Sequence, residues 1–358
     1  MMTTKFRSLR MGLLGLALAA GGVNAADWFP LKVNVRSAGQ TERERLADYR
    51  PLDKATRKWS ICVSLPHLKD PFFVAVNYGM VEEARRLGVS MQTMDAGGYT
   101  ALNTQITQIE NCVARGAQAV VLAAIAADGM NNVLTQLKAK GIPVVDAING
   151  VTSPDTAVRV LTSPREEGLR AGQYLAAKHP AGSKAVKVAW LPGPAGAGFV
   201  EAFSSGFHEG IKGSAVVVAE TKYGDVGKEV QARLVEDLLQ THKDLDYIAG
   251  TAVTAEGAVP MLKARRLADK VKLVSVYMTP RVYELVRSGD VEAAGAAPVP
   301  LLGRIMLDSA VRVLEKKVEF TDVNTLGKVW TKADISSLEK NFVLAPAQFR
   351  PVFALEGK

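Results

Sequence analysis

Two adjacent phenylalanines at the start of a predicted helix are the residues best placed to contact a ligand. Phe72 and Phe73 follow Pro71, in a loop after a buried apolar strand at residues 61–63. Hydrophobic residues then recur at helical spacing as far as Leu87. Loops at the carboxyl ends of parallel strands are where open α/β sheets bind ligands. The two rings could therefore form a wall of a binding cleft, or could belong only to the helix core.

Groups that would catalyse a reaction are sparse. The four histidines are far apart and lack metal-ligand spacing: His67, His179, His208 and His242. Neither a G-x-S-x-G elbow nor a Walker A loop occurs. A glycine-rich stretch at 193–198 follows a predicted strand and opens a helix, so its amides could hold an anion. A tight strand-to-helix turn explains that stretch better, and we predict a protein that is not an enzyme and needs no metal or cofactor.

Apolar strands alternate with helices along most of the chain. Strands are predicted at 61–63, 89–95, 119–124 and 142–148, with helical spacing between them. The alternation restarts after a further strand and ends with a helix at 301–316. This pattern predicts parallel sheets covered by helices on both faces. Two units of similar size imply an α/β protein of two Rossmann-like lobes around a central cleft, which closes about hinge segments.

The amino terminus has the three-part pattern of a secretory signal. Three cations precede an apolar run at 11–20, and Val23-Asn24-Ala25 is a small-residue cleavage site. The run is shorter than the ~20 residues of a spanning helix, so we expect export with cleavage near Ala25 rather than a membrane anchor. Residues 26–57 have the composition of an extension that packs along a domain. Without the three signal cations the net charge of +8 becomes 8 − 3 = +5, and the remaining basic residues are dispersed mostly over predicted helix faces, which argues against a nucleic-acid groove.

The chain has two cysteines, and their positions permit a disulfide. Cys62 lies in the opening strand and Cys112 late in the second predicted helix. In a doubly wound sheet that helix can cross back over the opening strand. An oxidising compartment would allow the two thiols to bond, with a stabilisation of ~4 kcal/mol from loop closure. Two small buried core residues are the alternative, and the pattern favours the disulfide.

Short motifs spread along the chain carry a family resemblance. They are Leu68-Lys69-Asp70, Asn77-Tyr78-Gly79-Met80, Ala96-Gly97-Gly98-Tyr99, Leu191-Pro192-Gly193-Pro194, Ala249-Gly250-Thr251-Ala252 and Phe349-Arg350-Pro351-Val352. Together they resemble type I periplasmic binding proteins, in particular the TorT-like group that senses trimethylamine N-oxide (TMAO). The resemblance implies a periplasmic sensor that binds a TMAO-like methylated amine or N-oxide. It also implies a partner, the periplasmic domain of a TorS-like sensor histidine kinase in a two-component system.

The same resemblance implies how the chain is divided. Chains of this kind cross between their lobes more than once. We expect an N-terminal lobe of residues 58–160 and 297–325, and a C-terminal lobe of residues 161–296 and 326–358. The predicted helix at 301–316 should therefore return to the first lobe, and the tail, residues 326–358, should rejoin the second.

For the site, the resemblance implies an aromatic box around methyl groups and an acid near the polar atom. The expected ligand-binding residues are Asp70, Phe72, Phe73, Tyr99, Asp128 and Tyr277. Asp70 could instead serve only to cap the first helix. The chain departs from the family pattern at positions where an aromatic residue is expected: a tryptophan at Phe73 and at Pro164, and a tyrosine at Leu65.

The Phe72-Phe73 pair also resembles the ring-stacking loop of ribose-type binding proteins. A sugar-binding component of an ABC transporter is therefore the alternative function. Such proteins surround the sugar with polar side chains, whereas this chain offers Ala252-Val253, Tyr277-Met278 and Ala297-Pro298 at the comparable loop ends. Each sugar hydroxyl left unpaired would cost about 1–3 kcal/mol. The residues therefore favour a small, largely apolar ligand.

Overall fold

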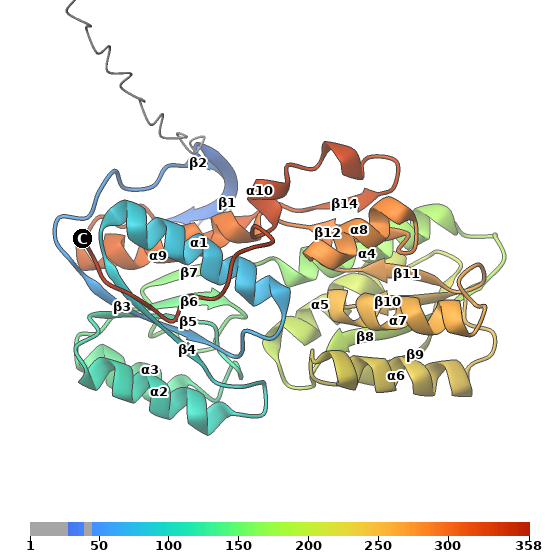
Figure 1. Ribbon diagram of the computed structural model, residues 1–358, viewed down its shortest axis with the longest axis horizontal. Coiled ribbons are helices and arrows are strands. Elements are labelled where there is room, and N and C mark those ends of the chain that lie inside the picture. The colour runs from blue at the N-terminus through green and yellow to red at the C-terminus, as the bar shows by residue number, and fades with distance from the viewer. Residues whose placement is uncertain (1–27, 39–44) are drawn as a thin grey trace, which may run out of the picture.

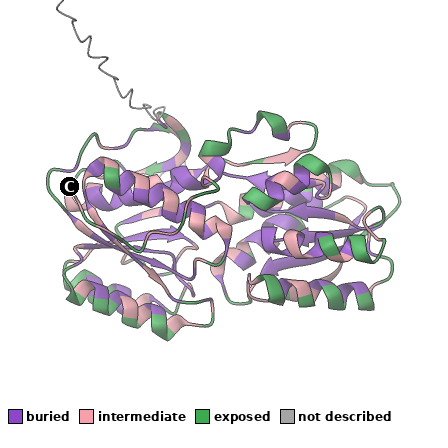
Figure 2. Ribbon diagram, in the orientation of Figure 1, coloured by how far each residue is buried: buried purple, intermediate pink, exposed green. Residues whose placement is uncertain are grey.

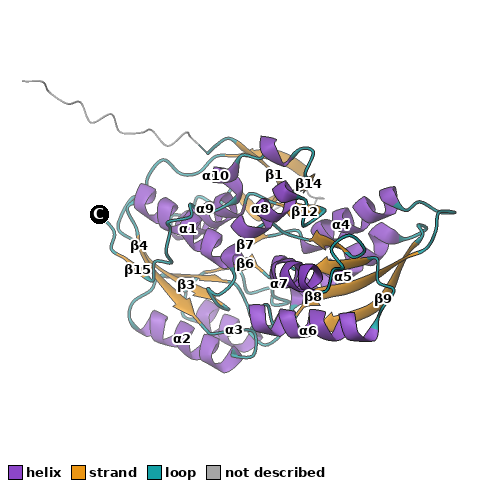
Figure 3. Ribbon diagram, turned by 45° about the vertical axis from the view of Figure 1, so that its right-hand side comes forward, coloured by secondary structure: helices purple, strands orange, loops and turns teal. Residues whose placement is uncertain are grey.

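The computed structural model describes residues 28–38 and 45–358. Within these residues the chain forms two β-sheets side by side, each covered by helices on both faces (Figures 1 and 3). This is the two-lobed α/β architecture expected from the alternating pattern. The predicted signal segment, residues 1–25, lies outside the described residues.

The sheet of the first lobe is parallel at its centre and antiparallel at its edges. In spatial order its strands are β15 (Ala354–Leu355), β4 (Ser90–Asp95), β3 (Ser60–Leu65), β5 (Ala119–Leu122), β6 (Val144–Ile148), β7 (Val158–Leu161), β13 (Phe320–Thr325), β1 (Leu31–Ser37) and β2 (Arg45–Tyr49). The strands from β4 to β13 run parallel, whereas β15, β1 and β2 pair antiparallel with their neighbours. The amino-terminal extension thus adds two strands to one edge of this sheet.

The sheet of the second lobe repeats the arrangement. Its strands are, in spatial order, β14 (Lys328–Thr331), β12 (Ala293–Ala296), β11 (Lys272–Ser275), β10 (Tyr247–Gly250), β8 (Val186–Gly193) and β9 (Val216–Tyr223). All are parallel except β14, which pairs antiparallel with β12. Because the strands of both lobes run into loops at their carboxyl ends, these loops are available to form a site.

Helices cover both faces of each sheet, with buried faces toward the strands and exposed faces outward (Figure 2). In the first lobe they are α1 (Pro71–Leu87), α2 (Leu102–Ala114), α3 (Asn131–Ala139) and α9 (Val299–Leu314). The remaining helices are α4 (Pro164–Lys178), α5 (Gly198–Ile211), α6 (Lys228–Thr241), α7 (Ala252–Ala264), α8 (Pro280–Ser288), the short η1 (Ile335–Ser337) and α10 (Lys340–Val343). In the part of the chain that the structure describes, no helix has the length and apolar character needed to cross a membrane.

The chain passes between the lobes at several points. It leaves the first lobe between β7 and α4 and returns between β12 and α9, which packs against α1. At α1–α9 the helices come into backbone contact, since a Cβ at Gly79 would lie 1.8 Å from the Pro300 carbonyl oxygen. A third passage joins β13 of the first sheet to β14 of the second.

The tail differs from its expected course. It contains β14, η1, α10 and β15. It does not stay with the second lobe, because β15 pairs with β4 at the edge of the first sheet. The Asn77 side chain holds this return by donating to the Val352 carbonyl at 3.1 Å and accepting from its amide at 2.8 Å. Tyr78 and Phe349 add a ring contact with centroids 5.0 Å apart.

The disulfide predicted between Cys62 and Cys112 is present. It joins β3 to α2, and both residues are buried in the cluster that packs α2 and α3 against the first sheet. The bond ties the strand that leads into the Phe72-Phe73 loop to the helix covering it.

Candidate functional site

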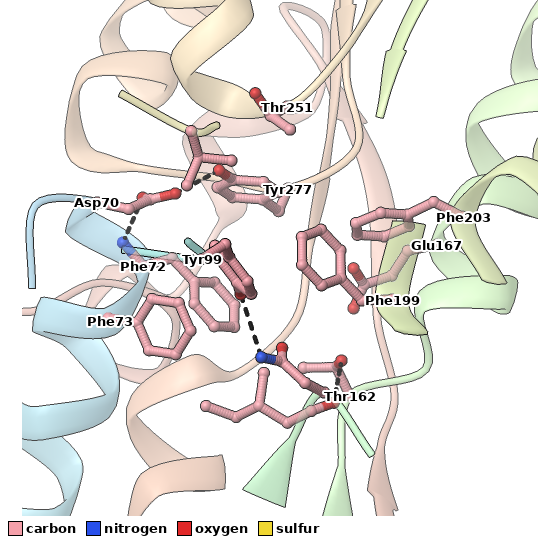
Figure 4. A pocket seen from close by; sticks show the side chains of 13 residues that line it. Asp70, Phe72, Phe73, Tyr99, Thr162, Glu167, Phe199, Phe203, Thr251 and Tyr277 are labelled. Atoms are coloured by element: carbon pink, nitrogen blue, oxygen red, sulfur yellow. Dashed lines mark hydrogen bonds between the residues drawn. The ribbon is translucent and has the colours of Figure 1, made fainter. Parts of the chain in front are cut away.

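A small cavity lies between the lobes, where strand ends of both sheets meet (Figure 4). The volume open to the centre of a water molecule is about 40 Å³. Its walls come from both lobes, and its lining residues are Asp70, Phe72, Phe73, Tyr99, Ile148, Asn149, Thr162, Glu167, Phe199, Phe203, Val226, Thr251 and Tyr277. All but one of the expected ligand-binding residues are among them.

The loop after β3 and the first turn of α1 form one wall of the cavity. Asp70 is the N-cap of α1, and its Oδ1 accepts a hydrogen bond from the Phe72 amide at 2.9 Å. Pro71 occupies the first helical position, which suits its missing amide hydrogen. This cap places Phe72 and Phe73 in the first turn of α1, beside the carboxyl ends of the strands of the first sheet. Asp70 therefore both caps the helix and lines the cavity, so the two interpretations of this residue are compatible.

Asp70 also joins the lobes. Its Oδ2 accepts a hydrogen bond at 2.5 Å from the hydroxyl of Tyr277, which follows β11 in the second lobe. Burial raises the pKa of Asp70 to about 6, although its bond to Tyr277 acts in the opposite direction. Burial and the adjacent carboxylate raise the pKa of Tyr277 well above its usual value, so this phenol stays protonated and donates.

Aromatic rings from both lobes make up most of the remaining wall. Phe72 contacts Phe73 and Tyr277 edge to face, with centroids 5.4 and 5.6 Å apart. Tyr99, in the loop after β4, contacts Phe199 of α5 at 5.5 Å between centroids. The Tyr99 hydroxyl accepts a hydrogen bond from Asn149 Nδ2 at 3.1 Å, and burial raises its pKa. The rings are thus held in fixed orientations around the space.

Phe199 and Phe203 of α5 were not identified from the sequence. They lie four residues apart at the beginning of a helix that follows a strand, which is the same signal that Phe72 and Phe73 gave. Pro164, where an aromatic residue was expected, begins α4 and is not one of the residues lining the cavity. Rings from α5 therefore supply an aromatic wall that the family pattern placed elsewhere.

Glu167, in the first turn of α4, was also missed. Only 8% of its surface is exposed, and its carboxylate lies beside the Phe199 ring (Figure 4). Burial raises its pKa to about 7, while the charge of Arg170 acts in the opposite direction. In the sequence it resembles any acidic residue in the first turn of a helix, and only the packing of α4 against α5 brings it into the cavity.

Asp128 was predicted to bind the ligand, but the structure does not bring it to the cavity with the other predicted residues. It lies exposed in the loop before α3, outside the residues that line the cavity. Its Oδ1 accepts a hydrogen bond from the Thr152 hydroxyl at 2.6 Å. The loop after β5 turns this carboxylate to the surface, so its position at a strand end was not sufficient to place it in the site.

His67 packs against two rings of the aromatic wall. It is 1% exposed, and its ring meets Phe73 and Tyr99 at 5.0 and 5.5 Å between centroids. Burial lowers its pKa to about 4, with a further contribution from the charge of Lys69. The ring is therefore neutral at pH 7 and contributes packing to the aromatic wall.

A second contact between the lobes lies at the rim of the cavity. Lys69 Nζ pairs with Asp225 Oδ2 at 2.5 Å, joining the loop after β3 to the loop after β9. Gly98 lies directly beside this pair, since a Cβ there would come within 3.2 Å of Lys69 Nζ. Together with Asp70–Tyr277, this ion pair holds the lobes in contact on one side of the cavity.

The chemistry of the site is that of binding. It offers ring faces, two buried carboxyl groups and a few hydroxyl and amide groups. Among the described residues, no cluster of three His, Cys, Asp or Glu side chains could hold a metal ion.

Comparisons with known proteins place this site in context. A family profile described as a periplasmic binding protein domain matches residues 61–317. The periplasmic protein TorT of Escherichia coli K12 is 32% identical over 300 residues, which cover 84% of this chain and 86% of TorT.

Solved structures of similar fold include a transporter solute-binding protein and TorT. An ABC transporter solute-binding protein from Bradyrhizobium sp. BTAi1, solved with bound Bis-Tris, is 48% identical, with a TM-score of 0.79 over 92% of this chain and 99% of that one. TorT in the complex with the TorS sensor domain, solved without ligand, is 28% identical, with a TM-score of 0.75 over 83% of this chain and all of that one.

Proposed function

This chain belongs to the periplasmic binding protein family, and from that premise we propose that it binds a small methylated amine or N-oxide between its lobes. We further propose that it acts in the periplasm, after removal of the signal segment, as the ligand-sensing partner of a membrane histidine kinase. The observation that carries the proposal is the convergence of ring faces from both lobes on one small cavity.

The aromatic wall suits methylated ammonium groups. Such groups are weakly hydrated and are attracted to the negative face of an aromatic ring, with about 0.5–2 kcal/mol per good contact. Phe72 and Tyr99 from the first lobe, and Phe199 and Tyr277 from the second, line the same space. A ligand between them would contact both lobes and would favour the closed arrangement.

The size of the cavity favours a ligand with few heavy atoms. One water needs roughly 10–15 Å³ of the volume open to its centre. About 40 Å³ therefore corresponds to roughly three waters, which favours a compact ligand such as TMAO over a larger one. A pentose has twice as many heavy atoms as TMAO and would require the lobes to separate.

The polar groups in the cavity also fit this class of ligand. Asp70 can accept a hydrogen bond from a protonated N-oxide or from an ammonium N–H. Thr162 and Thr251 already form hydrogen bonds, to the Ile148 carbonyl and within the α7 cap respectively. Few groups are left for the several hydroxyls of a sugar, each of which would cost about 1–3 kcal/mol if unpaired.

The sensor role is supported by the relatives. TorT is similar over most of both chains, and TorT has been solved in complex with the TorS sensor domain. A ligand controls such a partnership only through its differential affinity for the open and closed lobes. In this chain the Asp70–Tyr277 and Lys69–Asp225 contacts join the two lobes directly, so a ligand that alters them would alter how the lobes sit.

Calorimetric titration of the chain beginning at residue 26 tests ligand binding. TMAO or trimethylamine should bind, and ribose should not. Tyr277→Ala should weaken methylamine binding without unfolding either lobe. Binding of ribose with no heat from any methylated compound would contradict the proposal.

Delivery of a solute to an ABC transporter is the second candidate, because the 48% identical neighbour is described as a transporter solute-binding protein. Genes next to that of this chain distinguish the two roles: a hybrid kinase supports sensing, whereas a permease with an ATPase supports transport. Gel filtration should give a complex with the periplasmic domain of the neighbouring kinase, as TorT forms one with the TorS sensor domain in the absence of ligand. The absence of this complex would favour transport.

A further inference from the structure

The carboxylate of Glu167 is the one charged group of the described cavity lining that has no partner of its own. Within the described residues, no hydrogen bond or ion pair reaches this carboxylate, and only the more distant charge of Arg170 acts on it. The residue is nevertheless more than nine-tenths buried and lines the cavity. A buried charge without a partner is unfavourable, so a cation in the cavity would relieve a cost that the folded chain already carries.

The packing of α4 against α5 holds Glu167 at this place. A Cβ at Gly168 would lie 2.1 Å from the Phe203 carbonyl oxygen, so the two helices are in backbone contact next to Glu167. A Cβ at Gly206 would come within 1.9 Å of the Arg165 carbonyl on the same side. This close contact carries the Glu167 side chain to Phe199 and Phe203, and the charge therefore lies among ring faces.

Asp70 differs from Glu167 in this respect. Each oxygen of Asp70 already accepts a hydrogen bond, one from the Phe72 amide and one from the Tyr277 hydroxyl. The basic side chains near the cavity are also engaged: Lys69 pairs with Asp225, and Lys228 lies 3.8 Å from Glu256. None of the described residues that line the cavity is a lysine, arginine or histidine. The cavity therefore presents two carboxyl groups and no compensating cation.

We propose that Glu167 is a ligand-binding residue and that it selects a protonated methylamine, with its N–H directed at this carboxylate and its methyl groups against the rings. This inference rests on the proposed function and narrows its ligand class from methylated amines and N-oxides to ammonium ions. TMAO, which is neutral at pH 8, presents an oxygen where the ammonium ion presents a proton. Glu167 thus discriminates between two molecules of almost the same shape.

Isothermal calorimetry at pH 8 tests the inference, with trimethylammonium chloride, TMAO and ribose as the probes. Trimethylammonium should bind the unmodified chain at least tenfold more tightly than TMAO. Glu167→Gln should lose about ten- to a hundredfold in affinity for trimethylammonium, the range expected for a hydrogen bond to a charged group. It should leave TMAO binding within about threefold, because the glutamine amide can donate to the N-oxide.

Glu166→Gln is the matched control, since Glu166 is the preceding residue, with a side chain 47% exposed. It should leave both affinities unchanged. Glu167→Asp keeps the charge on a shorter chain and should retain the preference for trimethylammonium, so it serves if the glutamine variant does not fold.

The outcomes separate this inference from the function on which it rests. TMAO bound at least as tightly as trimethylammonium, with both affinities unchanged in Glu167→Gln, would overturn the inference and leave the proposed function standing. Ribose bound in the absence of any methylamine binding would overturn both. An equal loss in the Glu166 and Glu167 variants would also overturn the inference, because it would indicate a general effect of surface charge.

Discussion

Tyr277→Phe should weaken the contact between the lobes while leaving the aromatic wall intact. The Tyr277 hydroxyl donates to Asp70 Oδ2 at 2.5 Å, and both residues are buried. Phenylalanine keeps the ring that contacts Phe72 across the cavity. The substitution therefore removes one donor and leaves one oxygen of Asp70 without its partner.

The expected cost depends on pH. A hydrogen bond to a charged group contributes about 1.5–3 kcal/mol, and a neutral one about 1 kcal/mol. Asp70 has a pKa of about 6, so it is charged at pH 8 and largely protonated at pH 5. Its bond with Tyr277 lowers that pKa, which means that the bond favours the charged form. The loss caused by Tyr277→Phe should therefore be larger at pH 8 than at pH 5.

Urea unfolding followed by tryptophan fluorescence measures this loss at the two pH values. Tyr174→Phe is the control, because its hydroxyl also donates to a carboxylate, Glu292 Oε1 at 3.0 Å, but within the second lobe. Small-angle X-ray scattering then separates the two variants. Tyr277→Phe should increase the radius of gyration of the ligand-free chain, and Tyr174→Phe should not.

Two results would refute this reasoning. The first is an equal loss of stability at pH 5 and pH 8, which would mean that the charge of Asp70 is not engaged by Tyr277. The second is an unchanged radius of gyration in Tyr277→Phe, which would mean that this bond does not hold the lobes together.

Other parts of the structure lead to three further predictions. The ligand-free Glu167→Gln variant should be more stable than the unmodified chain by on the order of 3 kcal/mol at pH 8, and about equal to it below pH 4.5. The reason is that the pKa of Glu167 is raised from 4.5 to about 7, so its charged form is disfavoured in the folded chain. Urea unfolding across this pH range measures the difference in stability, and a difference that does not change with pH would contradict the prediction. Lys69→Met or Asp225→Asn should each lower the free energy of unfolding by no more than about 1 kcal/mol, and by less in about 1 M salt, because this ion pair is partly exposed. Thermal unfolding with and without salt tests this, and a larger loss of stability that salt does not change would contradict it. Reduction of the disulfide between β3 and α2 should lower the free energy of unfolding by about 4 kcal/mol, because it links residues 50 positions apart; an unchanged urea midpoint in dithiothreitol would count against it.

The sequence predicted those cavity-lining residues whose position follows from local pattern. Asp70, Phe72 and Phe73 lie between a strand and a helix, and a helix cap fixes where they point. Tyr99 and Tyr277 follow strands at the same edge of their sheets, so a doubly wound topology brings them to the cleft. The convergence of these side chains follows from strand order and needs no detail of packing.

Other features could not be read in this way because they depend on contacts between distant segments. Glu167 lines the cavity only because glycines let α4 and α5 approach to backbone contact. Asp128 has the strand-end position of a ligand-binding residue, but its loop turns outward. The return of the tail depends on the side chain of Asn77, which pairs with a backbone 275 residues away. Local periodicity carries no information about such pairings.

The distribution of cavity groups between the lobes determines what a ligand can do. Asp70 and Phe72 belong to the first lobe, and Glu167, Phe199 and Tyr277 to the second. A ligand that contacts both sets has its full affinity only when the lobes are closed. The difference between its affinities for the closed and the open lobes sets how far it can shift the equilibrium between them. The direct contact between Asp70 and Tyr277 already favours closure without a ligand. A cation that neutralises Glu167 would add the contribution that the ligand-free cavity lacks, so the charge of the ligand, rather than its methyl groups alone, should decide how far the equilibrium shifts.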